Sequence, residues 1–265
     1  MVDAGLYDPS FINCPIPDVC LGQHVFPMLA GTVGTKHGVV MTAASSMKIT
    51  IFGQGGHGSM PHLCIDPVVI AAGIVIKLQT IVARELPPSE VGVVTVGAIQ
   101  AGSTENVIAD EAVLKVDMRA ISEETRGKIL ASIERIVRAE CVAGRCPKEP
   151  VFEKTREFPV TANDAGIADK VRESFDQYFG DRHDDNVAMN MASEDFGVLA
   201  SSVGKPAMFW FFGGYSEERM KSKEGVPNNH SPFFAPDIQP TLQTGIDALV
   251  VAALTFVGKA WDRLM

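Results

Sequence analysis

The stretch SMKITIFGQGGHGSMPH, Ser46–His62, decides how this chain is divided. Its first half, SMKITIFG (Ser46–Gly53), alternates apolar and polar residues, and this pattern predicts a β-strand. Its second half, from Gly53 onward, holds four glycines, two histidines and a proline. Glycines without a Cβ would let His57 come close to a ligand. An ordinary turn that contains histidine explains this segment equally well when it is taken alone.

The residues that follow complete a small domain over 46–156. Asp66–Glu85 predicts a helix with Asp66 as its N-cap and a proline at the first helical position. Ser122–Glu140 opens with a capping signature and predicts a second helix. Strands are predicted at Val91–Gly102, Ala112–Ala120 and Val151–Val160. The order strand–helix–strand–strand–helix–strand is typical of the ferredoxin-like arrangement.

The two flanking regions predict a different layer. Residues 164–179 predict a helix, a short helix follows SEDFG, AMFWFFGG (207–214) predicts a strand, and 241–264 predict a long helix. Alternating helices and strands favour an α/β domain. Each flank is too small to stand alone. We therefore predict one α/β domain from residues 1–45 and 157–265, with the domain of residues 46–156 inserted into it.

Charge and composition exclude several classes of function. The 265 residues carry a formal net charge of −9, which repels the phosphates of nucleic acids. The longest apolar run, residues 248–257, is shorter than the roughly 20 residues that span a bilayer. The first ten residues do not resemble a signal peptide. Five irregularly spaced cysteines favour reduced thiols and a cytoplasmic protein, although Cys141 and Cys146 could pair across a short loop.

Among the six histidines, His24 and His230 stand out because each follows a strand-like segment. Ligands of α/β sheets bind at strand ends. An ordinary loop histidine remains the simpler interpretation of each one alone. We expect His37 and His183 to be exposed loop residues. His62 has metal-ligand spacing to a cysteine but would need further ligands from elsewhere.

Several segments together resemble a known family. GQHVFP, GQGGHGSMPH, NVIAD, DMR, SEDFG and NNHSPFF follow one another in the order seen in the metal-dependent amidohydrolases, which are related to aminoacylases and carboxypeptidases. The chain also lacks the motifs of serine hydrolases and of nucleotide-binding enzymes. The resemblance implies an α/β catalytic domain with two metal ions and an inserted lid that dimerises.

The resemblance assigns roles to five residues of this chain. His24 and His230 match ligands of the metal pair. His57 matches a lid histidine that reaches the partner subunit's active site and holds the oxygen of the scissile carbonyl. Asn106 and Arg119 match lid residues that bind the substrate's terminal carboxylate, a role that suits the fork of an arginine.

The chain also departs from the family pattern. Ala109 and Ala192 replace a usual proline and a usual glycine, and neither change removes a functional group. Nothing before His24 matches the family's histidine–cysteine metal motif or its pair of adjacent glutamates. We therefore expect the N-terminal part of the catalytic domain to be missing. The complete enzyme would bind two divalent ions, zinc, manganese or cobalt, and this chain would bind them weakly or not at all.

Two functions follow. The first is metal-dependent hydrolysis of the amide bond in N-acyl amino acids or related small amides, by the complete protein as a homodimer joined through the lid. The second is a catalytically inactive, truncated form that only dimerises or binds small carboxylates. The predicted partners are a small-molecule substrate and a second copy of the chain, with no nucleic acid and no membrane.

Overall fold

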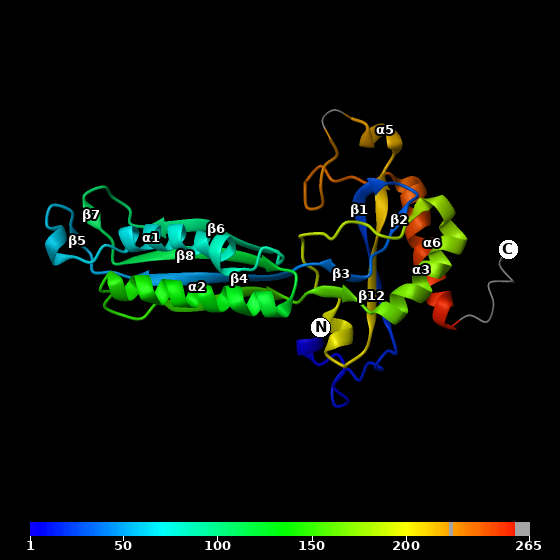
Figure 1. Ribbon diagram of the computed structural model, residues 1–265, viewed down its shortest axis with the longest axis horizontal. Coiled ribbons are helices and arrows are strands. Elements are labelled where there is room, and N and C mark those ends of the chain that lie inside the picture. The colour runs from blue at the N-terminus through cyan, green and yellow to red at the C-terminus, as the bar shows by residue number, and fades with distance from the viewer. Residues whose placement is uncertain (223–224, 258–265) are drawn as a thin grey trace. The chain divides into compact units, whose positions relative to one another are not determined.

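The computed structural model describes residues 1–222 and 225–257, which form two compact units (Figure 1). Unit 1 comprises residues 1–41, 161–190 and 195–265, and unit 2 comprises residues 42–160 and 191–194. The short segment 191–194 joins unit 2 because the Thr42 hydroxyl donates to the carbonyl oxygens of Met191 (2.9 Å) and Ala192 (3.2 Å).

Unit 2 is a four-stranded antiparallel sheet with two helices. Its elements, in chain order, are β4 (Ala43–Phe52), α1 (Pro67–Thr80), β6 (Gly92–Ala101), β8 (Glu111–Ala120), α2 (Glu123–Ala143) and β9 (Val151–Phe158). The strand order is β6-β8-β4-β9. This order and the alternation of strands and helices confirm the ferredoxin-like arrangement.

Helix starts in unit 2 follow the predicted capping chemistry. The Asp66 carboxylate accepts a hydrogen bond from the Val68 backbone nitrogen (2.9 Å), and Pro67 opens α1. The Ser122 hydroxyl accepts from the Thr125 nitrogen (3.0 Å) at the start of α2. After Thr80, the last turns widen into a π-helical segment, η3 (Ile81–Glu85).

One continuous core joins the sheet of unit 2 to its helices. The inward face of the strands alternates with an outward polar face, as the sequence pattern predicts. Fully buried side chains from both layers meet there, and they include Ile49, Ile51, Leu114, Met118, Ile74, Leu78, Ile129 and Ile133. The sheet of unit 2 forms one side of this core, and α1 and α2 form the other side.

The end of unit 2 that lies beyond Phe52 and Glu111 carries a small two-stranded sheet, which we call the tip. It pairs β5 (Gly56–His57) with β7 (Val107–Ile108), and the one-turn helix η2 (Pro61–Leu63) follows β5 (Figure 1). Glycine is required here because the chains approach closely. A Cβ on Gly53 would lie 2.4 Å from the Ile65 carbonyl oxygen.

Unit 1 is built on a mixed sheet with strand order β1-β12-β2-β11. β1 (Cys20–Leu29) runs parallel to β12 (Ala207–Tyr215), whereas β2 (Val33–Gly34) is antiparallel to β12 and parallel to β11 (His183–Asp184). A separate pair joins β3 (Gly38–Met41) to β10 (Thr161–Asn163). Five helices accompany these strands: η1 (Val2–Ala4), α3 (Ala165–Phe179), η4 (Gly180–Arg182), α4 (Val198–Ser201) and α5 (Glu217–Met220).

The core of unit 1 lies between β12 and two helices, α3 and α6 (Ile238–Val257). Met208 and the fully buried Trp210 of β12 pack there against Phe175 of α3 and Val251 of α6. Asn163 anchors the strand, since its side chain exchanges hydrogen bonds with the Phe209 backbone at 2.7 and 2.9 Å.

Most predicted elements of unit 1 are present, with different ends. α6 begins at Ile238 and has a non-helical residue at Gln239; the predicted helix beyond Val257 lies outside the described residues. The sequence indicated only a strand-like segment that ends near His24, whereas the ten-residue strand β1 continues past this residue to Leu29.

By length and apolar composition alone, two helical stretches could cross a membrane, residues 67–85 and 238–257. Both stretches also contribute buried side chains to a core, such as Ile74 in the first and Val251 in the second. A core helix of a globular domain passes the same test, so this is weak evidence for a span.

Candidate functional site

The tip holds His57 and Asn106 side by side. His57 ends β5 and pairs with Val107, and the next residue, Gly58, donates its backbone N–H to the Asn106 carbonyl oxygen at 2.8 Å. Both side chains belong to exposed residues. Two of the predicted site residues, 49 positions apart in the sequence, are therefore fixed together by backbone pairing.

The hydrogen bonds of His57 define which of its nitrogens can donate. Nδ1 accepts from the Ser59 backbone N–H at 3.1 Å and lies 2.8 Å from the Ser59 hydroxyl. A backbone N–H can only donate, so a neutral His57 carries its proton on Nε2. The exposed tip thus presents an N–H donor, which is the group that an oxyanion or a carbonyl oxygen binds.

Arg119 lies far from the tip within one chain. It is the ninth residue of β8, eight residues after Glu111, the end that adjoins the tip. At 3.4 Å per residue this separation is roughly 27 Å. His57 and Arg119 of the same chain therefore cannot contact one small substrate.

Two side chains orient the Arg119 guanidinium. Its Nε donates to the Asp117 carboxylate at 2.9 Å, and Nη1 donates to the Ser193 hydroxyl at 3.1 Å. Asp117 in turn accepts from the Ser46 hydroxyl at 2.7 Å. The Arg119 side chain is 23% exposed. Within residues 1–222 and 225–257 no side chain or carbonyl accepts a hydrogen bond from its Nη2 group, which can therefore bind an anion.

His24 and the loop that carries His230 meet at one backbone oxygen in unit 1. His24 Nδ1 lies 2.7 Å from the Val25 carbonyl oxygen, and the Asn229 side-chain nitrogen donates to the same oxygen at 3.0 Å. The sequence had indicated that His24 lies at a strand end, but it lies in the middle of β1. His230 lies in a turn with φ of 67°.

The ring orientation of His24 suits a metal ligand, but the donor set is too small. Donation from Nδ1 to Val25 leaves Nε2 as the free lone pair, the arrangement that metal-binding histidines adopt. A catalytic zinc needs about three protein ligands. The described residues contain no group of three or more histidine, cysteine, aspartate or glutamate side chains that could hold an ion. These residues alone therefore do not fit a tightly bound metal.

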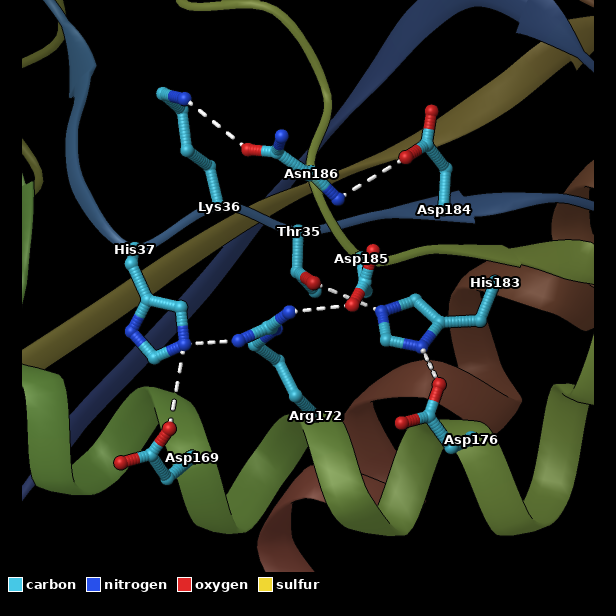
Figure 2. Close-up of polar contacts among 10 residues, drawn as sticks. All are labelled: Thr35, Lys36, His37, Asp169, Arg172, Asp176, His183, Asp184, Asp185 and Asn186. Atoms are coloured by element: carbon cyan, nitrogen blue, oxygen red, sulfur yellow. Dashed lines mark hydrogen bonds and ion pairs between the residues drawn. The ribbon is translucent and has the colours of Figure 1, made fainter.

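The expectation for His183 was wrong. Its side chain is 0% exposed and lies between the Asp176 carboxylate (2.7 Å from Nδ1) and the Thr35 hydroxyl (2.8 Å from Nε2), as Figure 2 shows. The ring also packs edge-on against Phe175. These contacts give His183 a structural role, since both of its nitrogens are already bonded.

His37 is exposed, as expected, yet it takes part in a polar network. Its Nε2 contacts Arg172, which also donates to Asp185 at 2.6 Å, and lies 3.2 Å from Asp169 (Figure 2). Arg172 and Asp169 lie on α3, Asp185 follows β11, and all three belong to unit 1. The contacts link α3 to the residues after β11.

Sequence reasoning missed the residues that orient the candidate groups. Ser59, Asp117 and Ser193 do so through hydrogen bonds to His57 and Arg119. A signal existed for two of them. Ser59 follows His57 by two residues in a glycine turn. Asp117 precedes Arg119 by two residues, and this spacing places the Asp117 and Arg119 side chains on the same face of a strand. Ser193 comes from a distant segment, which no local pattern could connect to Arg119.

Comparisons with known proteins give this geometry a family context. Residues 43–145 match the peptidase dimerisation domain of the M20 family. The N-acetyldiaminopimelate deacetylase of Exiguobacterium sibiricum is 35% identical over 225 residues, which are 84% of this chain and 56% of the relative. The deacetylase of Geobacillus thermodenitrificans is 32% identical over 216 residues, 80% of this chain and 55% of the relative.

Solved structures show the same fold. A protein of methicillin-resistant Staphylococcus aureus with a provisional assignment as an aminohydrolase is 27% identical, with a TM-score of 0.77 over 96% of this chain and 60% of that chain. An M20 dinuclear metal-binding peptidase of Bacillus subtilis is 21% identical, with a TM-score of 0.69, and covers 97% of this chain and 59% of that chain.

This chain spans a little over half the length of the curated relatives it matches. The match to the dimerisation domain covers unit 2 from β4 to the end of α2 and stops before β9. The ferredoxin-like unit, the match to the dimerisation domain and the similarity across more than four-fifths of the chain agree with one another. The chain is related to the M20 family of metal-dependent amidohydrolases and peptidases and carries that family's dimerisation domain.

Proposed function

We propose that this chain forms the lid and part of the α/β domain of a metal-dependent amidohydrolase that cleaves N-acyl amino acids or related small amides. The observation that carries the proposal is the exposed Nε2–H of His57, held by Ser59 beside Asn106 at the tip. A donor fixed in this way can stabilise the negative oxygen that forms when an amide carbonyl is attacked. The deacetylase relatives cleave an amide of this kind.

The active site proposed here needs two copies of the chain. His57 and Asn106 lie roughly 27 Å or more from Arg119 along one protomer, whereas an N-acyl amino acid is only several ångströms long. In a homodimer, the tip of one protomer would face the site that holds Arg119 of the other. The guanidinium, oriented by Asp117, would bind the substrate carboxylate, and His57 would bind the acyl oxygen.

Divalent metal ions belong to this proposal through the relatives, one of which is a dinuclear metal-binding peptidase. Of the residues in this chain, His24 and His230 would contribute one ligand each, and further ligands must come from outside the described set. When bound, the ions would activate the attacking water. The cytoplasm remains the predicted compartment, and it suits the five free cysteines.

The small number of metal ligands among the described residues favours a second function. Two histidines without a third ligand would leave a chain that dimerises and binds small carboxylates through Arg119, without hydrolysis. This alternative predicts dimers with no retained metal.

Metal content and turnover separate the two functions. We would incubate the purified chain with zinc, manganese or cobalt, desalt it, and measure metal per chain together with release of acetate from N-acetyl amino acids. Close to two ions per chain with turnover supports the hydrolase in this chain alone. No metal and no turnover, with a stable dimer, supports the binding module.

The role of His57 is tested in whichever preparation hydrolyses substrate. His57→Ala should lower kcat by about 10²–10³, the usual effect of removing an oxyanion donor. Arg119→Lys keeps the charge but loses the fork, and should mainly raise KM. His62→Ala is the matched control, because His62 is an exposed histidine five residues away with no assigned role. An unchanged kcat in His57→Ala would contradict the proposal.

A further inference from the structure

The sheet of unit 2 carries a hollow of about 590 Å³, which we call the sheet hollow. Residues of all four strands line it, and three of them are cations: Lys48, Lys115 and Arg156. Leu114 and Val116, the neighbours of Lys115 in β8, are buried against the helices. Successive side chains of a strand point to opposite faces, so the Lys115 side chain and the sheet hollow lie on the face away from α1 and α2.

Two β-bulges shape the sheet hollow. The register of β6 against β8 shifts around Gly97, and the register of β9 against β4 shifts around Thr155. Both residues belong to the edge strands of the sheet, and both line the sheet hollow. Bulges bend a strand, redirect its side chains and are common beside functional sites. A Cβ on Gly97 would have no neighbour closer than the Lys115 carbonyl oxygen at 4.0 Å, so crowding does not require glycine there.

The two lysines of the sheet hollow face each other across the sheet. Lys48 of β4 and Lys115 of β8 occupy directly opposite positions, and like charges in such positions destabilise a sheet. The Glu153 carboxylate relieves Lys48, whose Nζ lies 3.1 Å from it. Within residues 1–222 and 225–257, Lys115 has no ion pair and no side-chain hydrogen bond. The Lys115 ammonium is therefore available to an anion.

The charges around these lysines do not balance them. Among the described residues, Asp117 is the one acid that lines the sheet hollow, and its carboxylate already accepts from Arg119 at 2.9 Å and from Ser46 at 2.7 Å. The Arg156 guanidinium lies 5.9 Å from the centre of the Phe158 ring, and no carboxylate of the described chain pairs with it. The sheet hollow is thus locally positive in a chain whose net charge is −9.

We propose that the sheet hollow binds a small organic anion that carries two or more negative charges on carboxylate or phosphate groups. The Arg156 fork would bind one charged group, and Lys48 and Lys115 would bind another. A bound anion would also offset the repulsion between the two lysines.

The sheet hollow differs from the place where Arg119 would bind substrate. Lys115 and Arg119 are four residues apart in β8, which separates their Cα atoms by roughly 14 Å. The proposal therefore stands whether or not the chain takes part in hydrolysis.

Titration calorimetry of the purified chain tests the proposal. The probes are propane-1,2,3-tricarboxylate and glycerol phosphate, with acetate as the monoanion control. In about 0.1 M salt, charges more than roughly 10 Å apart are largely screened, so binding reports on nearby cations. We expect one site per chain for at least one multivalent probe and binding of acetate at least about tenfold weaker, because acetate can satisfy only one of the two positive ends. The probe that binds more tightly identifies the charged group that the site prefers.

Three substitutions locate the bound anion. Lys115→Met keeps the length of the side chain and removes its charge, so the affinity should fall at least about tenfold. Lys154→Met is the matched control: it makes the same charge change on β9, but the Lys154 ammonium pairs with Glu157 at 3.0 Å and does not line the sheet hollow. Its affinity should stay within about twofold of the parent chain. Arg119→Met should also retain binding.

A second variant protects the test against a folding defect. Lys115 and Arg156 are both exposed, so their substitution should leave the urea midpoint of the chain unchanged. If Lys115→Met alters that midpoint, Arg156→Gln provides the same comparison from the other end of the sheet hollow.

Four results would overturn the proposal. Neither multivalent probe could bind at concentrations on the order of 10 mM. Acetate could bind as tightly as the multivalent probes. Lys115→Met and Lys154→Met could weaken binding equally, which would indicate attraction to surface charge in general. Arg119→Met alone could abolish binding, which would place the anion at the Arg119 guanidinium instead of the sheet hollow.

Discussion

Unit 2 and unit 1 both combine a sheet with helices, but their buried residues are organised differently. In unit 2, two helices cover the sheet and their buried residues form a single core. In unit 1, α3 and α6 cover part of the sheet, while β1 has an open edge and the outer face of α6 exposes leucine and isoleucine. Exposed apolar side chains do not separate the units, because α1 of unit 2 also exposes Val69 and Ile76. What separates them is packing: unit 2 has one continuous core, whereas the buried residues of unit 1 form two clusters. The comparison teaches that one chain can build its two units on differently organised cores.

The largest contrast is expected between two leucines. Leu114→Ala removes a fully buried side chain from the core of unit 2 and should lower the free energy of unfolding by about 2–5 kcal/mol. Leu242→Ala removes a side chain that is 57% exposed and should change it by no more than about 0.5 kcal/mol. Urea unfolding followed by far-ultraviolet circular dichroism measures both. Equal losses would show that the Leu242 side chain is packed in solution.

The two units should also unfold separately. Trp210 and all three tyrosines lie in unit 1, and residues 42–160 and 191–194 contain neither residue type. Trp261→Phe leaves Trp210 as the only tryptophan, so fluorescence reports unit 1 alone. Its urea midpoint should lie below the last transition in circular dichroism. A single coincident transition by both probes would mean that the units unfold as one.

Acid should weaken an ion-pair set in unit 2. The Arg135 guanidinium donates to the Glu85 carboxylate at 2.6 and 2.7 Å and lowers the pKa of Glu85, with help from Ser132. A lowered pKa stabilises the fold above the ordinary pKa of glutamate, and this gain is lost as the pH falls through the lowered value.

The pair is partly exposed, so its contribution should not exceed about 1 kcal/mol. Glu85→Gln should therefore flatten the pH dependence of unfolding below about pH 5, the ordinary glutamate range. Glu124→Gln is the control, because that side chain is 77% exposed. The same slope in the parent chain and in Glu85→Gln would rule out this ion pair as its source.

The smallest effect concerns a thiol. Burial in the core of unit 2 raises the pKa of Cys141 to about 12, so almost no thiolate forms near pH 8. Iodoacetamide should modify Cys14 and Cys64 first and Cys141 only when unit 2 unfolds, as mass spectrometry of urea-treated samples would show. Early modification of Cys141 would mean that unit 2 opens before unit 1.

Unit 2 could be predicted from sequence because its signals are local. Strand alternation from Ser46, the Asp66 cap and the Ser122 cap all lie within a few residues of what they specify. Unit 1 was harder. β1 includes Pro27 and a register shift after Phe26, so its pattern is irregular. The environment of His183 depends on Asp176 and Thr35, and only the fold brings Thr35 to it.

The candidate site could likewise be predicted only in part from the sequence. The resemblance to a known family identified the candidate residues, whereas their arrangement in space required the structure. No sequence spacing shows that His57 and Asn106 share one small sheet, or that Arg119 lies at the far end of β8. Ser193 reaches Arg119 across 74 positions, which is beyond any periodic pattern.

The length of β8 also fixes a distance within unit 2. The ten residues of this strand set the distance between His57 at the tip and Arg119 near the other end of the strand, and every one of them pairs with β4. Individual residues of β8 can be substituted during evolution as long as the inward side chains stay apolar. The length of β8 cannot change in the same way, because inserting or deleting one residue would turn Arg119 toward the core and change its distance from His57 by about 3 Å. Across homologues of this protein, substitutions should accumulate in β8 while gaps do not.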